Sequence, residues 1–504
     1  MHDITHKLCL FVAYCFSARS LPVTDTSSIL HTLGLLPLPF WLALAALISY
    51  GVTAWKLRTD AIGLPMLMVL FTAGLWYFGD ALYNDYTEYI WNIGPAALSA
   101  AWWQVLIFVV AFGWMTPHVH QWVNGKLPEQ KSSIVVLFQH GVQGATKFQD
   151  QLDGMTKFLA SIWAFLMVIA LLRTNFDLIG NFMPYLGIKA EPWMRGRVGG
   201  GFDSLMSLAR FVLVGLTAGF GVVVALSTRN YTRYMALIIY LLTAPTFIFD
   251  RTRSTMLAVL LPGFCAWAFL RLKGSVWMKL GALLVGFFLI QSWLKFVIEN
   301  RTHNSIAASF AWGGTTPTAP VKHQGLSMLS ELGHVNMYME NGSYHPNWGA
   351  RYFAEIVNPI PRALWPGKPM IGIDYAMARG MAFDQANGSA GGVGATMSTG
   401  MIGQGVVNFG TFFGPIAAAF LMAFWASVLA RQDLLADEGG RIFLYAIGFF
   451  LTFNMGRDIT LLVLYPFCFG YLLLYGVQMY KRGSGRPAAP PEPASMPDGQ
   501  PHSV

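Results

Sequence analysis

A succession of apolar runs dominates this sequence from about residue 35 to residue 480, with short polar stretches between most of them. Several runs approach the roughly 20 residues that a helix needs to cross about 30 Å of hydrocarbon. Of the 504 residues, 55% are hydrophobic and 12% are charged, and this charged share is about half that of a soluble globular domain. Because a helix satisfies its own backbone polar groups in lipid, we predict an all-α, polytopic integral membrane protein.

The apolar runs predict 11 transmembrane helices, or 12 if the N-terminal segment 1–34 also crosses the membrane. The predicted spans are 35–55, 61–78, 98–114, 157–172, 205–226, 234–249, 255–270, 280–298, 401–429, 442–455 and 459–480. Residues 35–298 therefore hold transmembrane helices 1–8, and residues 401–482 hold transmembrane helices 9–11. Between them lies one large loop, residues 299–400, and the Pro-rich residues 483–504 form a predicted disordered cytoplasmic tail.

The distribution of Lys and Arg predicts the orientation of the chain. Lys56 and Arg58 follow the predicted span 35–55 and place its C-terminal end in the cytoplasm by the positive-inside rule. The alternation of spans then puts the large loop outside, which is the periplasm in a Gram-negative cell. The net charge of +8 has the same topological origin, and we predict no nucleic-acid partner. The four cysteines have no metal-ligand spacing, so we predict no metal site.

The large loop is polar where the rest of the chain is apolar, and residues 331–369 gather acids, histidines and cations. Long unstructured loops are uncommon unless they are functional or disordered. Aromatic residues in this loop, among them Trp348, Tyr352 and Phe353, argue against disorder. We therefore expect short helices that pack back on the bundle, and we expect the functional site among them.

Residues 358–369 read NPIPRALWPGKP, and the four prolines exclude a continuous helix and define a turn path. Arg362 and Lys368 are presented from this path beside Trp365. A guanidinium binds phosphate oxygens with two hydrogen bonds and an ammonium adds a point charge, so the segment suits a diphosphate at the membrane surface. The alternative is that these three residues anchor the loop among lipid headgroups.

The order of these features resembles the large periplasmic loop of O-antigen and exopolysaccharide repeat-unit polymerases of the Wzy type. The loop residues that carry the resemblance are Glu331, His334, Arg351 and residues 360–369. Two flanking segments extend it: residues 250–254 (DRTRS) resemble the family's arginine at the external start of a helix, and residues 403–410 (GQGVVNFG) resemble its Gly-rich segment after the loop. The matches cover residues 250–415.

The resemblance implies a C-type glycosyltransferase-like bundle in the bacterial inner membrane. Such an enzyme would transfer a growing glycan from undecaprenyl diphosphate to a lipid-linked repeat unit at the periplasmic face, without a metal ion or another cofactor. Its partners would be the undecaprenyl-diphosphate-linked oligosaccharide, the membrane lipids and, as a further candidate, a chain-length regulator. Cations would stabilise the departing diphosphate, and a base would accept the proton of the acceptor hydroxyl.

The resemblance and the chemistry together select the candidate site residues. The candidate base is Glu331, His334 or Glu355, and the choice among the three stays open at this stage. The candidate ligands of the diphosphate and the sugar are Arg251, Arg253, Arg351, Arg362, Trp365 and Lys368. Gln404 departs from the family pattern, in which an acidic residue is common at this point.

The sequence is also compatible with two other functions. An O-antigen ligase has the same architecture but hands the finished glycan to a lipid core. A transporter or flippase of lipid-linked sugar would place charge within its spans, whereas the ionisable residues of this chain concentrate in external loops and at span ends. Lys295 and Arg210 are the main exceptions.

Overall fold

The computed structural model describes residues 32–127, 131–135, 146–184, 190–193, 203–249, 253–272, 327–357, 364–369, 373–379, 398–435, 441–457 and 461–483, together with residue 360 and separate residues between 274 and 293. Within these ranges the regular structure is helical, and the β-type pairing there is a single antiparallel bridge between Asp60 and Lys131. The predicted all-α fold is confirmed for this part of the chain. The predictions for residues 1–31, 294–326 and 484–504 lie outside the described residues.

The helices lie on both sides of the large loop and within it. Before the loop come α3 (Leu38–Lys56), α4 (Gly63–Ala73), the π-helical turn η1 (Gly74–Phe78), α5 (Gly79–Tyr83), α6 (Tyr86–Ile93), α7 (Pro95–Asn124), α9 (Thr146–Arg173), α10 (Leu178–Phe182), α11 (Asp203–Leu226), α12 (Asn230–Ile248) and α13 (Arg253–Leu270). The loop contributes α16 (Met328–Glu340), α17 (Ala350–Val357) and α18 (Ile373–Ala378), and the chain ends with α19 (Gly400–Leu434), α20 (Arg441–Met455) and α21 (Leu461–Gly483).

In the described part of the chain, six helices are long and apolar enough to cross a membrane. They are Leu38–Lys56, Gly63–Leu82, Pro95–Asn124, Leu152–Arg173, Ala209–Leu226 and Gly400–Leu434. Shorter apolar helices follow at Thr255–Ala268, Arg441–Met455 and Leu464–Gly476. Each predicted span coincides with a helix except 280–298, most of which lies outside the described residues. The number of helices of spanning length is lower than the 11 or 12 predicted spans because several of these runs form shorter helices.

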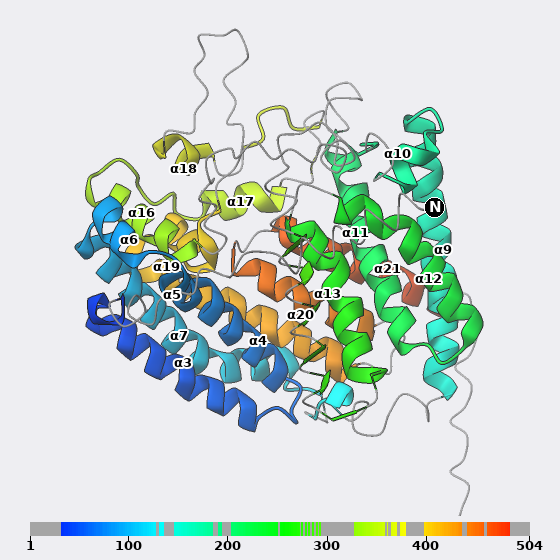
Figure 1. Ribbon diagram of the computed structural model, residues 1–504, viewed down its shortest axis with the longest axis horizontal. Coiled ribbons are helices and arrows are strands. Elements are labelled where there is room, and N and C mark those ends of the chain that lie inside the picture. The colour runs from blue at the N-terminus through cyan, green and yellow to red at the C-terminus, as the bar shows by residue number, and fades with distance from the viewer. Residues whose placement is uncertain are drawn as a thin grey trace, which may run out of the picture.

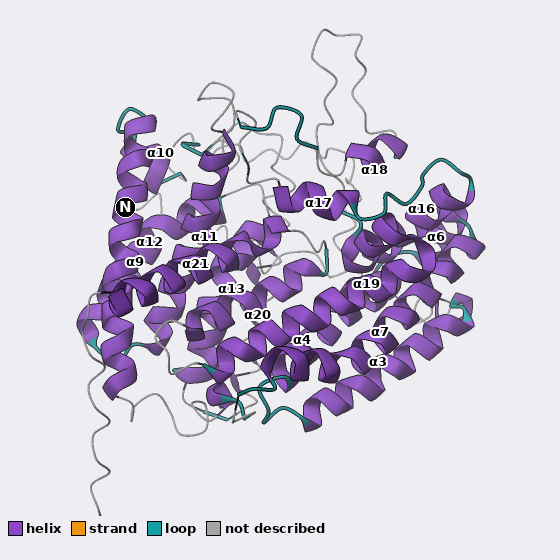
Figure 2. Cartoon of the chain, turned by 180° about the vertical axis from the view of Figure 1, so that it is seen from behind, coloured by secondary structure: helices purple, strands orange, loops and turns teal. Residues whose placement is uncertain are grey.

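The helices form two groups that lie side by side in Figures 1 and 2. The first group contains α3, α4, α7 and α19, and α7 packs along α19. The centre of this group is aromatic, because the ring of Trp102 contacts those of Phe40 and Phe78 at centroid distances of 4.8 Å and 5.0 Å. The second group contains α9 to α13 and α21. Helix α20 joins the groups, since it contacts α4 and α19 as well as α13 and α21.

Local sequence signals start the helices next to the site. Asp85 caps α6, and its carboxylate accepts hydrogen bonds from the backbone amides of Thr87 and Glu88. Gly94 has a φ of 95°, which suits glycine, and it joins α6 to α7. Pro95 then opens α7 in the first turn, where a missing N–H has no cost. The resulting corner between α6 and α7 packs against α16.

The loop helices α16, α17 and α18, named here the polar cap, lie at one end of the bundle (Figure 1). As predicted, α16 and α17 pack back on the spans. Helix α16 contacts α6, α7 and α19, and its Asn336 exchanges hydrogen bonds of 2.7 Å and 3.1 Å with Gln104 of α7. Helix α17 contacts α19 and α21, so the polar cap touches both groups of helices.

Helix α19 is broken at Gly410, whose φ of 80° lies outside the helical region. A Cβ atom built on Gly405 would lie 2.1 Å from the carbonyl oxygen of Gly414, although residues that far apart along a straight helix are separated by roughly 13 Å. The chain therefore turns back sharply at Gly410, and residues 400–409 form a short helix against the start of the following one. The sequence predicts one long Gly-rich span here, and the structure divides it.

Candidate functional site

Glu331, in the first turn of α16, joins α16 to α18. Its Oε1 accepts a hydrogen bond of 2.8 Å from Nη2 of Arg379, with which it forms an ion pair, and its Oε2 accepts one of 3.1 Å from the hydroxyl of Tyr375. Both Glu331 and Tyr375 are buried. Burial and the negative charge of Glu331 raise the pKa of Tyr375, so this hydroxyl keeps its proton and continues to donate.

His334 lies one turn after Glu331 on α16 and is half-buried. Its Nδ1 is 2.8 Å from the carbonyl oxygen of Ser330. Because a carbonyl oxygen only accepts, Nδ1 carries the proton of the neutral ring and Nε2 carries the lone pair. Burial and the positive charge of Arg379 lower the pKa of His334, which favours the neutral ring. A neutral imidazole with a directed Nε2 lone pair has the form that a general base requires.

Asp374 on α18 is a second centre of hydrogen bonds in the polar cap. Its Oδ2 accepts hydrogen bonds of 2.6 Å from the hydroxyl of Tyr344 and 3.1 Å from Nδ2 of Asn347. Burial opposes ionisation of Asp374, but the hydrogen bond from Tyr344 and the charge of Arg351 contribute to a lowered pKa. The ring of Tyr344 also packs edge-on against that of Tyr375 at a centroid distance of 5.7 Å, which joins this centre to the first one.

Arg351 and Glu355 lie one turn apart on the buried face of α17, with exposed fractions of 3% and 2%. Gln404 of α19 donates a hydrogen bond of 2.7 Å from Nε2 to Oε1 of Glu355. The Oε1 of Gln404 accepts a hydrogen bond of 3.2 Å from the hydroxyl of Thr399. Glu355 of a neighbouring helix therefore supplies a carboxylate directly beside Gln404.

The broken helix α19 also holds the start of α17 through backbone groups. The amide of Asn347 donates to the carbonyl oxygen of Val407 at 3.2 Å, and the amide of Tyr352 donates to Oδ1 of Asn408 at 3.3 Å. Asn408 is fully buried, and its Nδ2 donates to the carbonyl oxygen of Gln404 at 2.8 Å. The Gly-rich segment that carries part of the sequence resemblance thus lies directly against α17.

The proline-rich turn places Lys368 and Trp365 differently. Lys368 is buried, and its Nζ donates a hydrogen bond of 2.7 Å to the carbonyl oxygen of Ile360, which closes the turn. Trp365 is partly exposed and packs edge-on against Phe353 at a centroid distance of 6.4 Å. The turn therefore presents an aromatic surface, while the ammonium is engaged with the backbone.

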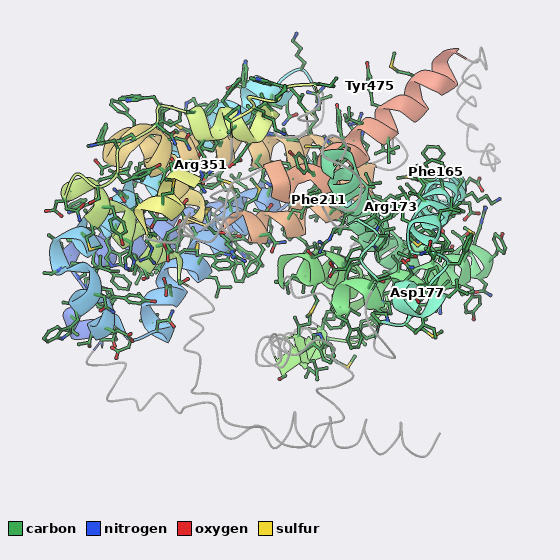
Figure 3. The ribbon with its side chains drawn as sticks, turned by 90° about the horizontal axis from the view of Figure 1, so that it is seen from above. Phe165, Arg173, Asp177, Phe211, Arg351 and Tyr475 are labelled. Carbon is green, nitrogen blue, oxygen red and sulfur yellow. The ribbon has the colours of Figure 1, made fainter. Side chains whose placement is uncertain are left out.

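The predicted arginines are only partly covered by the structure. Arg251 and Arg362 lie outside the described residues, and Arg253 is described as the first residue of α13 without a side-chain placement. In Figure 3, which looks down on the polar cap, Arg351 lies with the first group of helices, whereas Arg173 lies in the second group. Of the described candidates, Glu331 and His334 lie on α16 and Arg351 and Glu355 lie on α17, so all four belong to the polar cap.

Four members of the site carry no recognisable sequence motif: Tyr344, Asp374, Tyr375 and Arg379. Asp374 has no metal-ligand spacing, and the two tyrosines are separated from Glu331 in the sequence. One local signal exists, because Tyr375 and Arg379 are four residues apart and lie on one face where the backbone is helical. Their partner Glu331 is identified only by the tertiary structure.

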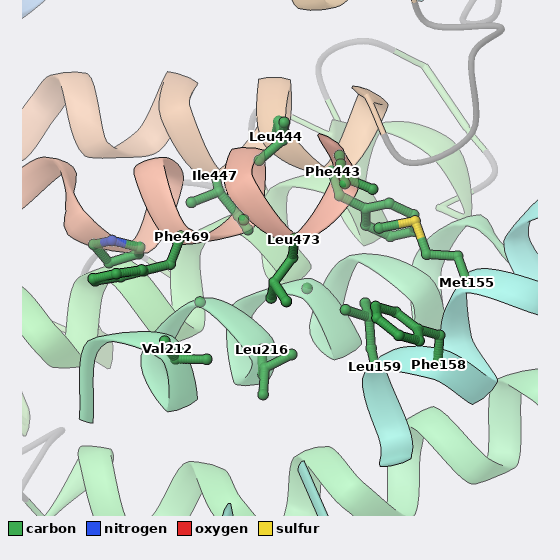
Figure 4. Close-up of a pocket in the computed structure, with 15 residues that line it drawn as sticks. Met155, Phe158, Leu159, Val212, Leu216, Phe443, Leu444, Ile447, Phe469 and Leu473 are labelled. Atoms are coloured by element: carbon green, nitrogen blue, oxygen red, sulfur yellow. The ribbon is translucent and has the colours of Figure 1, made fainter. Parts of the chain in front are cut away.

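A separate pocket lies between α9, α11, α20 and α21 (Figure 4). Its lining is apolar and includes Phe158, Leu159, Val212, Leu216, Phe443 and Leu473. Such a lining fits a hydrocarbon group and contributes no acid, base or cation. Among the described residues, no group of three or more His, Cys, Asp and Glu side chains is arranged to hold a metal ion.

The fold and the site define a class, a multi-pass helical membrane protein with buried charged residues in a helical cap at one end of the bundle. Comparison of the chain with protein-family models, with curated proteins and with solved structures gave no match. The function has to be inferred from the residues of the site and from the resemblance in the sequence.

Proposed function

We propose that this protein is an oligosaccharide repeat-unit polymerase at the periplasmic face of a bacterial inner membrane, with a C-type glycosyltransferase-like bundle. It transfers a growing glycan from undecaprenyl diphosphate to a lipid-linked repeat unit. The observation that carries the proposal is that His334, a histidine with a lowered pKa, and Arg351, a buried arginine, both lie in the polar cap. The order of motifs across residues 250–415 supports the same function.

In the proposed reaction the acceptor hydroxyl attacks the anomeric carbon of the donor glycan. A new C–O bond forms there while the bond to the diphosphate oxygen breaks, and undecaprenyl diphosphate leaves with the electron pair. Nε2 of His334 accepts the hydroxyl proton. Arg351 stabilises the charge that develops on the diphosphate, an effect on the order of a few kcal/mol in a site that excludes water.

Of the three candidate bases, His334 is the favoured one, because the carboxylates of Glu331 and Glu355 are already engaged in hydrogen bonds with other residues. Glu331 is engaged by Arg379 and Tyr375, and Glu355 is fully buried against Gln404. In the proposed mechanism these two carboxylates hold the helices of the cap, and His334 carries out the proton transfer. Arg251, Arg253, Arg362 and Lys368 stay candidates for further contacts with the diphosphate, and Trp365 for a contact with sugar.

The two alternative functions differ from the polymerase in their acceptor and in their product. A ligase uses the same chemistry but needs a lipid-core acceptor. A transporter of lipid-linked sugar leaves the oligosaccharide unchanged and is expected to line a path through the membrane with charge. The position of the described loop candidates, those on α16 and α17, at one end of the bundle supports a reaction at the membrane surface.

An assay with purified protein in lipid nanodiscs tests the proposal. The protein is incubated with an undecaprenyl-diphosphate-linked repeat unit as the single substrate, and the products are separated by length. The expected result is a ladder of longer lipid-linked oligosaccharides. A ligase gives no ladder and transfers the repeat unit to a lipid core when one is added, whereas a transporter leaves the repeat unit unchanged, so either of these results overturns the proposal. Deletion of the gene should accordingly remove long polymer from cells and leave single repeats.

A further inference from the structure

Two helices that contribute residues to the site, α16 and α19, both begin without a cap from their own chain segment. Ser327 precedes α16 and Thr399 precedes α19, and neither side chain forms an N-terminal cap hydrogen bond. The backbone at Ser327 has φ −137° and ψ 23°, which is far from the extended conformation that lets a capping side chain reach back to the helix. The first amides of both helices therefore need acceptors from elsewhere.

Asp80 supplies the missing acceptor for α16. Its Oδ2 accepts hydrogen bonds from the backbone amides of Leu329 at 2.8 Å and Ser330 at 3.3 Å. These are the second and third residues of the helix, which are the positions that a capping side chain normally serves. The carboxylate thus performs, from a membrane-spanning segment distant in the sequence, the role that Ser327 does not fill.

The other oxygen of Asp80 is occupied as well. Oδ1 accepts hydrogen bonds of 2.7 Å from the hydroxyl of Tyr89 and 2.5 Å from Nδ2 of Asn84. Asp80 is 0% exposed, and a buried carboxylate is tolerated only when its oxygens are hydrogen-bonded. Asn84 and Tyr89 therefore fix the carboxylate so that Oδ2 faces α16.

Tyr77 performs the same role for α19. Its hydroxyl oxygen accepts a hydrogen bond of 2.9 Å from the amide of Ile402, the third residue of that helix. The two preceding amides, those of Gly400 and Met401, donate to the carbonyl oxygens of Arg457 and Gly456 at 2.8 Å and 3.1 Å. A Cβ atom at Gly400 would lie 2.5 Å from the Tyr77 hydroxyl, so the helix starts in direct contact with this side chain.

Tyr77 and Asp80 are three residues apart, on the π-helical turn η1 and the α5 helix that continues it. Residues with this spacing lie on one face of a helix, and α16 and α19 are in contact with each other. A single short segment therefore caps two adjacent helices. A π-helical turn inside a helix is rare and often occurs at functional sites.

We propose that Tyr77 and Asp80 are positioning residues, which set the placement of α16 relative to α19 and thereby hold His334 and Gln404 in one site. Asp80 acts on α16, where His334 lies one turn beyond the capped amides. Tyr77 acts on α19, where Gln404 lies two residues beyond Ile402. The consequence for catalysis rests on the polymerase function proposed above, whereas the capping itself does not.

Asp80→Asn tests the cap on α16 in the full chain in nanodiscs. Asn84 donates to Oδ1 of Asp80. If the side-chain nitrogen of the new asparagine takes the place of Oδ1, it faces the Asn84 donor. If it takes the place of Oδ2, it faces the backbone amides of α16. Either orientation weakens the cap. We expect hydrogen–deuterium exchange in residues 327–334 to become about tenfold faster. The double variant Asp80→Asn with Asn84→Asp returns an acceptor to this place and should restore slow exchange.

Tyr77→Phe is the second variant and removes one oxygen atom. Exchange should rise at the start of α19 and not at α16. The matched control is Tyr86→Phe, because the Tyr86 hydroxyl is also buried, accepts a hydrogen bond of 3.3 Å from Trp102 Nε1 and caps no helix. This control should change exchange at neither helix.

The positioning role has its own readout in the ladder assay. Displacement of His334 should lower the rate per folded molecule and move the acid limb of the pH–rate profile, and the Asn84→Asp rescue should reverse both effects. Unchanged exchange in Asp80→Asn and Tyr77→Phe overturns the capping. Faster exchange with an unchanged rate and profile overturns the positioning role. If the unaltered protein makes no ladder, the polymerase proposal fails, and the exchange data still decide the capping.

Discussion

Nε2 of Gln404 donates a hydrogen bond of 2.7 Å to Oε1 of Glu355, and both side chains are buried between α19 and α17. An acid at position 404 would place two carboxylates at this distance. The carboxamide and the carboxylate are therefore complementary, and each depends on the identity of the other.

Gln404→Glu should destabilise the protein by about 2 kcal/mol or more, because a donor becomes a second buried carboxylate facing the first. The double variant Gln404→Glu with Glu355→Gln exchanges the two groups and should recover most of the loss. Thermal unfolding in detergent measures both effects. Equal stability of the single and double variants would show that the two residues are not coupled.

Arg351→Ala should abolish long polymer, and Arg351→Lys should reduce it by about tenfold or more, since an ammonium lacks the bidentate geometry of a guanidinium. Polysaccharide length profiles and protein abundance are measured together. Arg58→Ala is the control, because Arg58 is exposed beyond the C-terminal end of α3 and bonds to the Trp55 carbonyl oxygen. Full-length polymer in Arg351→Ala would remove Arg351 from the mechanism.

The pH dependence follows from the lowered pKa of His334. In the unfolded chain His334 has the ordinary histidine pKa of about 6.5. As the pH falls below this value, the unfolded chain binds a proton at His334 before the folded protein does, so the contribution of His334 to the free energy of unfolding is lost. The folded ring stays neutral until a lower pH. Polymer extension should therefore persist at pH 6.5 and decline only below it. An acid limb at or above pH 6.5 would contradict the assignment of His334 as the base.

Gly405→Ala tests the sharp turn in α19. The Cβ atom of the new alanine would lie 2.1 Å from the backbone oxygen of Gly414, so the segments on the two sides of Gly410 have to move apart. We expect the free energy of unfolding to fall by about 2 kcal/mol or more. Gly51→Ala in α3 is the control, because its Cβ meets nothing within 4 Å. The higher helix propensity of alanine should raise the free energy of unfolding of this variant by at most about 1 kcal/mol. Equal unfolding temperatures for the two variants would argue against the close contact.

The predicted orientation is tested with single cysteines in a variant without the native ones. A cysteine at Trp348, which is 75% exposed in the connection between α16 and α17, should react with a membrane-impermeant maleimide added to intact spheroplasts. A cysteine at the exposed Lys126, beyond the end of α7, should react only after the membrane is opened. The reverse pattern would place the polar cap in the cytoplasm.

The helices were predictable from the sequence because the length of an apolar run is a local property. The broken start of α19 was signalled only in part, since Gly403, Gly405 and Gly410 indicate close backbone contacts but not that the chain turns back. The partners of Glu331 were not predictable, because Tyr375 and Arg379 reach it through tertiary packing. The contacts of Asp80 with the start of α16 were not predictable either, because the pattern of apolar runs marks Asp80 only as the polar end of a span.

The capping of α16 by Asp80 has a practical consequence for the study of the large loop. A recombinant fragment that begins near residue 299 would lack the carboxylate that closes the first turn of α16, and it would lack Gln104 as a partner for Asn336. The described helix α16 therefore depends on residues outside the loop for these contacts. Antibodies or ligands raised against an isolated loop peptide would recognise a different conformation, whereas a fragment that includes residues 63–124 keeps both partners.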